Sequence, residues 1–285
     1  MEIEKAQELG LCFGVRRAVK LLKDAANTYG AIETLGPVAH NQQLVEELSE
    51  AGIKMVNALD QVQGKILAIP THGISPDMLG KIKACHIEII DTTCPIVRKA
   101  QNAAKKLAQN GFDVIVFGEA EHSEVKGLLG WAGGKGIAAL ESKQVVTAAA
   151  TKQALLTYRL GIISQTTQSQ PAFAEFATQL MAVFVSKLKE MRVVNTLCQA
   201  TQRRQQAAME LARRSDLVIV VGGHDSANTK HLAELCSPMV ETHLVERAEE
   251  IDSSWLLGKH HVGITAGAST PDEAVDEVIA KLRSL

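Results

Sequence analysis

A repeated cysteine constrains the fold of this chain more than any other feature. Cys12, Cys94 and Cys198 each end a strand-like run and begin a helix-like stretch, in GLCFGVRRA, DTTCPIVRKA and NTLCQATQRRQ. The spacing continues downstream, because in every copy a glycine follows the cysteine by 24 residues and a polar residue follows it by 28. Two equal offsets in three copies indicate an internal repeat. The glycines are Gly36, Gly118 and Gly222, and the polar residues are His40, His122 and Ser226.

Strand-like apolar runs alternate with amphipathic stretches from one end of the chain to the other. This alternation predicts βα units and mainly parallel sheets. The strand-like runs are 65–69, 87–90, 114–117, 160–163, 192–194, 217–221 and 262–265, and the helix-like stretches are 15–29, 96–109, 173–189 and 202–214. Combined with the repeat, the pattern predicts an α/β fold of three pseudo-symmetric modules, a trefoil, around a central site. The modules are 1–80, 81–185 and 186–285.

The five cysteines are odd in number and widely scattered, which fits neither a disulfide framework nor a CxxC zinc ribbon. A thiolate at the start of a helix is stabilised by the helix dipole and by free backbone N–H groups. Three such thiolates on one axis would make a three-sulfur metal site. Zinc with an external ligand is one possibility. An iron–sulfur cluster with one open iron is favoured, because thiolates are its normal ligands. Cys85 and Cys236 lie outside the repeated position and are interpreted as small buried hydrophobes.

Polar side chains gather where the predicted strands end and helices begin. In parallel sheets these ends surround the ligand crevice, and helix N-termini bind phosphate. Walker and GxGxxG loops are both absent, which favours a small phosphorylated substrate over a nucleotide. The alternative for the serines and asparagines is that they only cap helices. The candidates for substrate binding are His40, Asn41, His72, His122, Thr166, Thr167, Ser226, Asn228 and Ser269.

Two further features of these segments concern a carboxylate and a helix start. Glu124 follows His122 by two residues, and a buried carboxyl group there would serve as a proton donor with a raised pKa. The alternative is a solvated glutamate in a first helical turn. Thr270 and Glu273 have capping-box spacing with Pro271 at the first helical position, so we expect a helix that starts beside Ser269.

Composition excludes several classes of partner. Thirty basic and thirty-two acidic residues give a net charge of −2 without blocks of like charge, and only ten residues are aromatic. Neither feature favours nucleic-acid binding. The longest apolar runs have the length of strands, and no secretory h-region is seen, so we expect a cytoplasmic protein that does not enter a membrane.

Nine ordered segments resemble the LytB/IspH family of 4-hydroxy-3-methylbut-2-enyl diphosphate reductases over essentially the whole chain. They are GLCFGVRRA, GPVAHN, PTHGIS, DTTCPIV, GEAEHSEVKG, ISQTT, NTLCQATQRRQ, GGHDSANTKHL and GITAGASTPD. The resemblance implies a [4Fe–4S] cluster held by Cys12, Cys94 and Cys198, with the fourth iron open to the substrate. It also implies the last step of the non-mevalonate isoprenoid pathway, in which the allylic hydroxyl leaves as water and isopentenyl and dimethylallyl diphosphate form.

The same resemblance implies roles for the other candidates. Glu124 and Thr166 match the family's proton-delivery positions, with Thr167 beside them. Electrons would come from a ferredoxin or flavodoxin, because the chain has no flavin or nicotinamide fingerprint of its own. The diphosphate would be held by His40, His72, His122, Ser226, Asn228 and Ser269.

One position departs from the family pattern. Between Ser226 and Asn228 well-known members have a second serine, whereas this chain has Ala227. One hydroxyl contact to the diphosphate is lost there, though the backbone N–H remains, so we expect either weaker binding or a rearranged set of contacts to the diphosphate, and an unchanged reaction. Two alternatives stay open at this point: a three-cysteine zinc hydrolase or lyase acting on phosphorylated substrates, and a diphosphate sensor without turnover.

Overall fold

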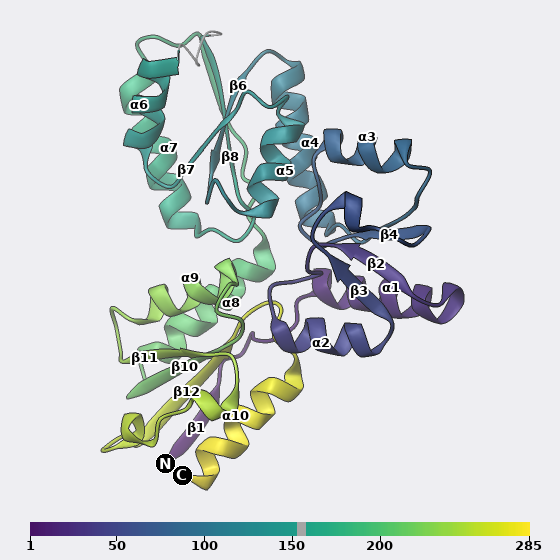
Figure 1. Ribbon diagram of the computed structural model, residues 1–285. Helices are drawn as coiled ribbons and strands as arrows, with labels where there is room; N and C mark the ends of the chain where they lie inside the picture. Colours follow the sequence, from purple (N-terminus) through teal and green to yellow (C-terminus); the bar gives the residue numbers. More distant parts are fainter. Residues whose placement is uncertain (153–157) are drawn as a thin grey trace. The chain divides into compact units, whose positions relative to one another are not determined.

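The computed structural model describes residues 1–152 and 158–285. The chain divides into two compact units (Figure 1): the first comprises residues 1–57 and 199–285, and the second comprises residues 58–198. Every strand pair described within the units is parallel. The predicted class, α/β with parallel sheets, is therefore confirmed.

The first unit contains a four-stranded sheet with the order β1-β12-β10-β11. Its strands are β1 (Glu2–Lys5), β10 (Leu217–Val221), β11 (Thr242–Val245) and β12 (His261–Ala266), and its helices are α8 (Gln199–Ala212), α9 (Ala227–Cys236) and α10 (Asp272–Ser284). The unit also holds α1 (Phe13–Tyr29), the pair β2 (Ile32–Leu35) and β3 (Ile53–Val56), α2 (Gln42–Glu50), and the short helices η2 (Ala248–Glu250) and η3 (Ser253–Leu256).

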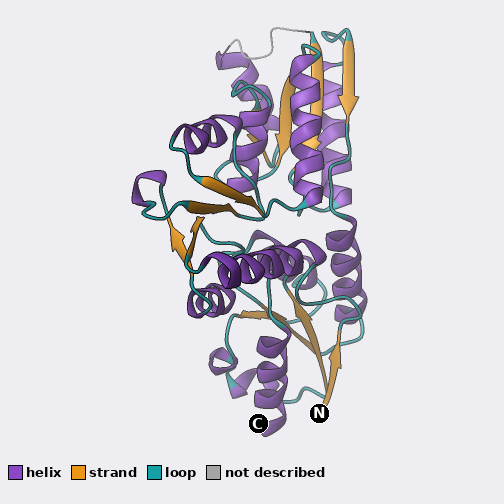
Figure 2. Ribbon diagram, turned by 90° about the vertical axis from the view of Figure 1, so that its right-hand side faces the viewer, coloured by secondary structure: helices purple, strands orange, loops and turns teal. Residues whose placement is uncertain are grey.

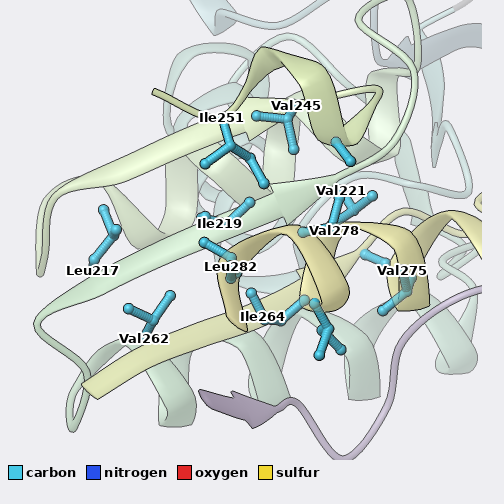
Figure 3. Packing of buried hydrophobic residues seen from close by; sticks show 13 residues of the cluster. Leu217, Ile219, Val221, Val245, Ile251, Val262, Ile264, Val275, Val278 and Leu282 are labelled. Carbon is cyan, nitrogen blue, oxygen red and sulfur yellow. The ribbon is translucent and has the colours of Figure 1, made fainter. Parts of the chain in front are cut away.

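The core of this sheet follows from strand alternation, in which successive side chains point to opposite faces. On β10, Leu217, Ile219 and Val221 pack with α10 and with β12 (Figure 3). Val218 and Val220 lie on the other face, with side chains of α8 and α9. A continuous apolar strand such as LVIVV is typical of a sheet covered by helices on both faces.

The second unit contains a sheet with the order β7-β6-β8-β9. Its strands are β6 (Asp113–Phe117), β7 (Ile137–Ala139), β8 (Arg159–Ser164) and β9 (Glu190–Val193). The strands β4 (Ile66–Ile69) and β5 (Glu88–Asp91) pair with each other in the same unit. The helices are η1 (Leu59–Gln61), α3 (Pro76–Ala84), α4 (Pro95–Gln109), α5 (Ser123–Trp131), α6 (Ser142–Lys152) and α7 (Gln170–Phe184).

Both faces of this second sheet are also covered by helices (Figures 1 and 2). Val114 and Val116 of β6 pack with α4 and α5, whereas Ile115 and Phe117 pack with α6 and α7. The sheet is therefore buried on both sides, and what remains accessible is its edges and the loops at its two ends.

The repeat that the cysteines predict is visible in the strand pairing. Each cysteine follows a strand that pairs with the third strand of a repeat: β5 with β4, β9 with β8, and β1 with β12. Each sheet thus takes its edge strand from the residues just before the next repeated cysteine. The predicted modules 1–80, 81–185 and 186–285 each contain one repeated cysteine, but these strand pairs join residues of different modules. The trefoil arrangement of the three modules stays a prediction.

Several local predictions were wrong. The helix expected over 173–189 ends at Phe184, and the Thr270 capping box does not form, because α10 begins at Asp272 after Pro271. The Thr270 hydroxyl instead donates to the carbonyl of Val221. The strands that the apolar runs missed are β1, β2, β3, β7 and β11, all short.

Candidate functional site

The three repeated cysteines share one local structure. Cys12 and Cys94 are the N-cap residues of α1 and α4, and Cys198 immediately precedes α8. No side-chain cap bond forms at Cys12 or Cys94, and all three residues are half-buried and outside any disulfide bond. Each of these thiols therefore lies at the positive, N-terminal end of a helix dipole.

A backbone hydrogen bond joins each cysteine to the loop that follows the third strand of a repeat. The N–H groups of Cys12, Cys94 and Cys198 donate to the carbonyls of Ala268, Thr71 and Thr166, each at 2.9 Å. The residue after each acceptor is a candidate for substrate binding: Ser269, His72 and Thr167. Cysteine and candidate ligand residue are therefore positioned together in all three copies, which confirms the repeat in its hydrogen bonding.

That the three cysteine side chains meet at one metal site stays a prediction. Cys12 belongs to the first unit, whereas Cys94 and Cys198 belong to the second. Within residues 1–152 and 158–285 the structure shows no group of three or more His, Cys, Asp or Glu side chains that could hold a metal ion.

The two cysteines outside the repeat differ from each other. Cys236 is buried, its Sγ lies 3.7 Å from the carbonyl of Ala208, and burial raises the pKa of its thiol to about 11. This confirms its interpretation as a buried hydrophobe. The same interpretation of Cys85 was wrong, because Cys85 is exposed and caps the C-terminus of α3.

In the first unit, polar side chains cap two helices. Asn41 Oδ1 accepts the N–H of Leu44 at the start of α2, and Ser226 Oγ accepts the N–H of Thr229 at the start of α9. In the third copy, the residue 28 positions after the repeated cysteine is therefore the helix cap, Ser226. In the first copy the residue at this offset is His40, and the helix cap is the next residue, Asn41. Capping is thus a real role of Ser226 and Asn41.

Close backbone contacts hold these two helix starts beside the β12 exit loop. The Ser269 hydroxyl donates to the carbonyl of His40 at 3.2 Å. A Cβ on Gly223 would lie 2.6 Å from the same carbonyl oxygen, so this glycine is required for the approach. Three loops from distant parts of the sequence therefore meet at one place in the first unit.

Two amides at this place lack partners. Asn228 is only 5 % exposed, and neither its side-chain oxygen nor its nitrogen has a hydrogen-bond partner among the described residues. Asn41 Nδ2 is likewise buried without a partner. Buried polar groups in native proteins are nearly always paired, so an unpaired amide at a helix N-terminus indicates a bound ligand. We call Asn41, Ser226, Asn228 and Ser269 the amide cradle.

In the second unit, Glu124 is the buried carboxyl group. It is 3 % exposed on the first turn of α5. The backbone N–H of Thr166 donates to its Oε1 at 2.7 Å, and the Thr166 hydroxyl donates to its Oε2 at 2.9 Å. Burial raises the pKa of Glu124 to about 7, against the two hydrogen bonds, which lower it. The alternative of a solvated first-turn glutamate is excluded by this burial.

Two histidines of the second unit have ring nitrogens engaged by the backbone. His122 caps α5, and its Nδ1 accepts the N–H of Glu124 at 3.2 Å. A neutral His122 therefore carries its proton on Nε2 and can donate there. His72 Nδ1 lies 3.1 Å from the carbonyl of Gly73, a contact in which Nδ1 donates.

One residue of this region escaped the sequence analysis. Gln165 is fully buried, its Oε1 accepts the N–H of Glu119 at 3.1 Å, and its Cβ would lie 2.7 Å from a Cβ placed on Gly118. It therefore fixes the β6 exit loop against the β8 exit loop. Its place in ISQTT, directly before Thr166, was the available signal.

These features define an α/β enzyme. Its strand exits carry a buried acid, cysteines at helix N-caps and unpaired amides. The chain belongs to the LytB family, whose model, described as LytB protein, matches residues 3–283.

Curated relatives agree over the full length. A 4-hydroxy-3-methylbut-2-enyl diphosphate reductase of Dehalococcoides mccartyi (strain CBDB1) is 43 % identical over 285 residues, covering 100 % of this chain and 99 % of the relative. A reductase of the same name from Geobacter sulfurreducens is 40 % identical over 286 residues, covering 99 % and 97 %.

Two solved structures are also similar. The first, (E)-4-hydroxy-3-methyl-but-2-enyl diphosphate reductase, described as the terminal enzyme of the non-mevalonate pathway, has a TM-score of 0.71 and 34 % identity and covers 100 % of both chains. The second, a Plasmodium falciparum E-1-hydroxy-2-methyl-but-2-enyl-4-diphosphate reductase, has a TM-score of 0.89 and 25 % identity, covering 98 % of this chain and 87 % of its own.

Proposed function

We propose that this chain reduces 4-hydroxy-3-methylbut-2-enyl diphosphate, removing its allylic hydroxyl as water to give isopentenyl and dimethylallyl diphosphate. The observation that carries the proposal is the buried Glu124–Thr166 pair beside the Cys198 loop. Thr166 donates twice to the Glu124 carboxyl group, and its own carbonyl accepts the N–H of Cys198. The proton donor and one repeated cysteine are thus joined through a single residue.

Glu124 supplies the proton in this proposal. With a pKa of about 7 the carboxyl group is substantially protonated at neutral pH, as a general acid must be. Thr166 orients the group through both of its oxygens, and Thr167 lies directly beside it in the sequence. Because the site is buried, a charge that develops on the leaving oxygen is met by this proton rather than by water.

The diphosphate is assigned to residues that can donate hydrogen bonds. In the first unit these are the amide cradle with His40 and the backbone N–H of Ala227, and in the second unit they are His72 and His122. The unpaired amide of Asn228 offers a donor that an anion would satisfy.

Cys12, Cys94 and Cys198 suit a [4Fe–4S] cluster by their chemistry: they are half-buried thiols outside any disulfide bond, each at the start of a helix. When bound, the cluster would relay two electrons from an external donor, one at a time, and would offer one open iron position. Three sulfur ligands would also suit zinc, so a zinc-dependent hydrolase or lyase is the second candidate function. The names of the relatives favour the reductase.

The electrons must come from outside the chain, and a cytoplasmic ferredoxin or flavodoxin completes the proposal. None of the helices described here is both long and apolar enough to cross a membrane.

Anaerobic purification followed by metal analysis and an assay tests this function. We expect about four irons per chain and turnover of the hydroxylated diphosphate with reduced methyl viologen. Stoichiometric zinc without iron would overturn the proposal in favour of a hydrolase or lyase. Binding of the diphosphate without turnover would identify a sensor instead.

A further inference from the structure

We infer that an acidic electron-transfer protein docks in a basic groove between α4 and β9 of the second unit. The groove has a volume of about 500 Å³ and its floor is apolar, formed by Ala103, Leu107 and Val194. Its rim carries Lys99, Lys106 and Arg192. None of the residues that line it is acidic. The inference rests on the proposed function, because only a reductase needs such a partner.

The positive charge of this groove is largely uncompensated. Lys99 and Lys106 form no ion pair with any described residue, and α4 contains no acidic residue over its whole length. Arg192 and Arg159 both bind Glu190, with nitrogen–oxygen distances of 2.7 and 2.6 Å. Two other hollows differ: Asp225 and Glu246 line one, and Glu141 and Glu175 line the other.

The groove is also built rigidly. The guanidinium groups of Arg159 and Arg192 lie over the ring of Phe112, 4.4 and 4.7 Å from its centroid. Phe112 itself is buried against α4. An interface whose charges are already held in place loses less entropy when a partner binds. β9 is an edge strand of its sheet, which leaves this side open to a partner.

Both walls of the groove lead to a repeated cysteine. Cys94 is the N-cap of α4, and Lys99 lies five residues further on, about 7.5 Å along the helix axis. Val194 precedes Cys198 by four residues, at most roughly 14 Å of extended chain. A partner seated here would hold its redox centre near two of the three cysteines. Complementary charge would mainly accelerate its association.

Charge reversal tests the docking surface. The variants are Lys106→Glu and the double Lys99→Glu/Lys106→Glu, and the probe is an acidic plant-type ferredoxin kept reduced by its NADPH-dependent reductase. We expect kcat/KM for the ferredoxin to fall by about tenfold in the single variant and further in the double, mostly through KM. Turnover with reduced methyl viologen should stay unchanged, because a small donor needs no docking surface.

Matched controls separate docking from a general charge effect. Lys65 and Lys83 are exposed lysines of the same unit, lie outside the groove and form no ion pair with a described residue. Lys65→Glu/Lys83→Glu should leave kcat/KM for the ferredoxin within about twofold, since neither lysine lines the groove and exposed charges are screened by salt. An equal loss in this control, or an unchanged KM in Lys99→Glu/Lys106→Glu, would overturn the inference.

A binding measurement keeps the two proposals separate. Calorimetric titration with oxidised ferredoxin requires no turnover, and the wild type should bind at low salt more tightly than the double variant. If the wild type fails to turn over with methyl viologen, the proposed reductase is wrong, whatever the ferredoxin does. If it turns over but binds ferredoxin no better than the double variant, the docking site is wrong and the reductase stands.

Discussion

Glu124 and Asn228 occupy corresponding places in the two units and differ in how their polar atoms are satisfied. Both lie in the first turn of a helix that follows the first strand of a repeat, and both are more than nine-tenths buried. Both oxygens of Glu124 accept a hydrogen bond from Thr166, whereas neither polar atom of Asn228 has a partner among the described residues. The acid site is complete without a ligand, whereas the amide cradle leaves polar atoms that the proposed diphosphate would pair.

The largest expected effect comes from breaking the completed site. Glu124→Gln keeps the size of the side chain but removes its proton, so kcat should fall about 10²- to 10⁴-fold, the usual contribution of a general acid. The assay is turnover with reduced methyl viologen. Glu121→Gln is the matched control, because Glu121 lies three residues earlier, is exposed and forms an ion pair with Lys126. Wild-type turnover in Glu124→Gln would remove this residue from the mechanism.

The same carboxyl group predicts a pH dependence. Because burial raises its pKa from 4.5 to about 7, kcat should fall as the pH rises through about 7. The protonated form is favoured in the folded state, so this group's contribution to the free energy of unfolding is fully present below about 4.5 and lost as the pH rises through 7. The loss amounts to up to about 3 kcal/mol. Glu124→Gln should lack this slope in denaturant titrations.

The incomplete site should respond in the opposite way. Asn228→Leu replaces an unpaired amide by an apolar group of similar size, so the ligand-free protein should gain about 1–3 kcal/mol in free energy of unfolding. At the same time KM for the diphosphate should rise by about tenfold or more, since a hydrogen bond to a charged group is lost. Asn27→Leu, on the exposed face of α1, is the control. A destabilised Asn228→Leu protein would show that the amide already has a partner.

A smaller effect should follow from loosening the acid site. Thr166→Val removes the hydroxyl that donates to Glu124 Oε2 but keeps the backbone N–H to Oε1. Since both hydrogen bonds lower the pKa of Glu124, the fall of kcat should move to higher pH. We expect kcat itself to drop by about tenfold through poorer orientation. Thr166→Ser should restore the wild-type profile; a pH profile unmoved in Thr166→Val would contradict this positioning role.

The smallest effect should come from adding a hydroxyl to the cradle. Ala227 is the first residue of α9, between Ser226 and Asn228. Ala227→Ser offers the diphosphate one more donor, and KM should fall by a few-fold, within the roughly 0.5–1.5 kcal/mol of a typical hydrogen bond. Measured kcat should stay the same, because the contact is equal in ground and transition states. A changed kcat would place position 227 nearer the reaction than the diphosphate.

The helix starts at the repeated cysteines and the central strands of this fold could be predicted from local sequence signals. Equal offsets placed Cys12, Cys94 and Cys198 at helix starts, and continuous apolar runs located the central strands. The short strands escaped detection because four residues with mixed exposure, such as IKMV of β3, carry little periodic signal. The pairing of β1 with β12 joins the two ends of the chain, and no local pattern reveals it.

The site was predictable in its residues but not in its contacts. The histidines, serines and asparagines were found because strand exits of parallel sheets gather ligand-binding groups. The Glu124–Thr166 pair spans 42 residues of sequence, so the raised pKa depends on tertiary burial that the motif EHSEVKG does not encode. The capping box predicted at Thr270 was wrong for a similar reason. The Thr270 hydroxyl donates to the carbonyl of Val221, at the end of the neighbouring strand, and does not cap the helix that follows it.

The central claim is that three of the five cysteines form one cluster site while the other two serve elsewhere. Iron per chain, measured after anaerobic purification of the five single Cys→Ser variants, tests it most directly. Cys12→Ser, Cys94→Ser and Cys198→Ser should each lose most of their iron, whereas Cys85→Ser and Cys236→Ser should retain the wild-type content. Iron lost from Cys85→Ser or Cys236→Ser, or full iron in any of the other three, would contradict the account.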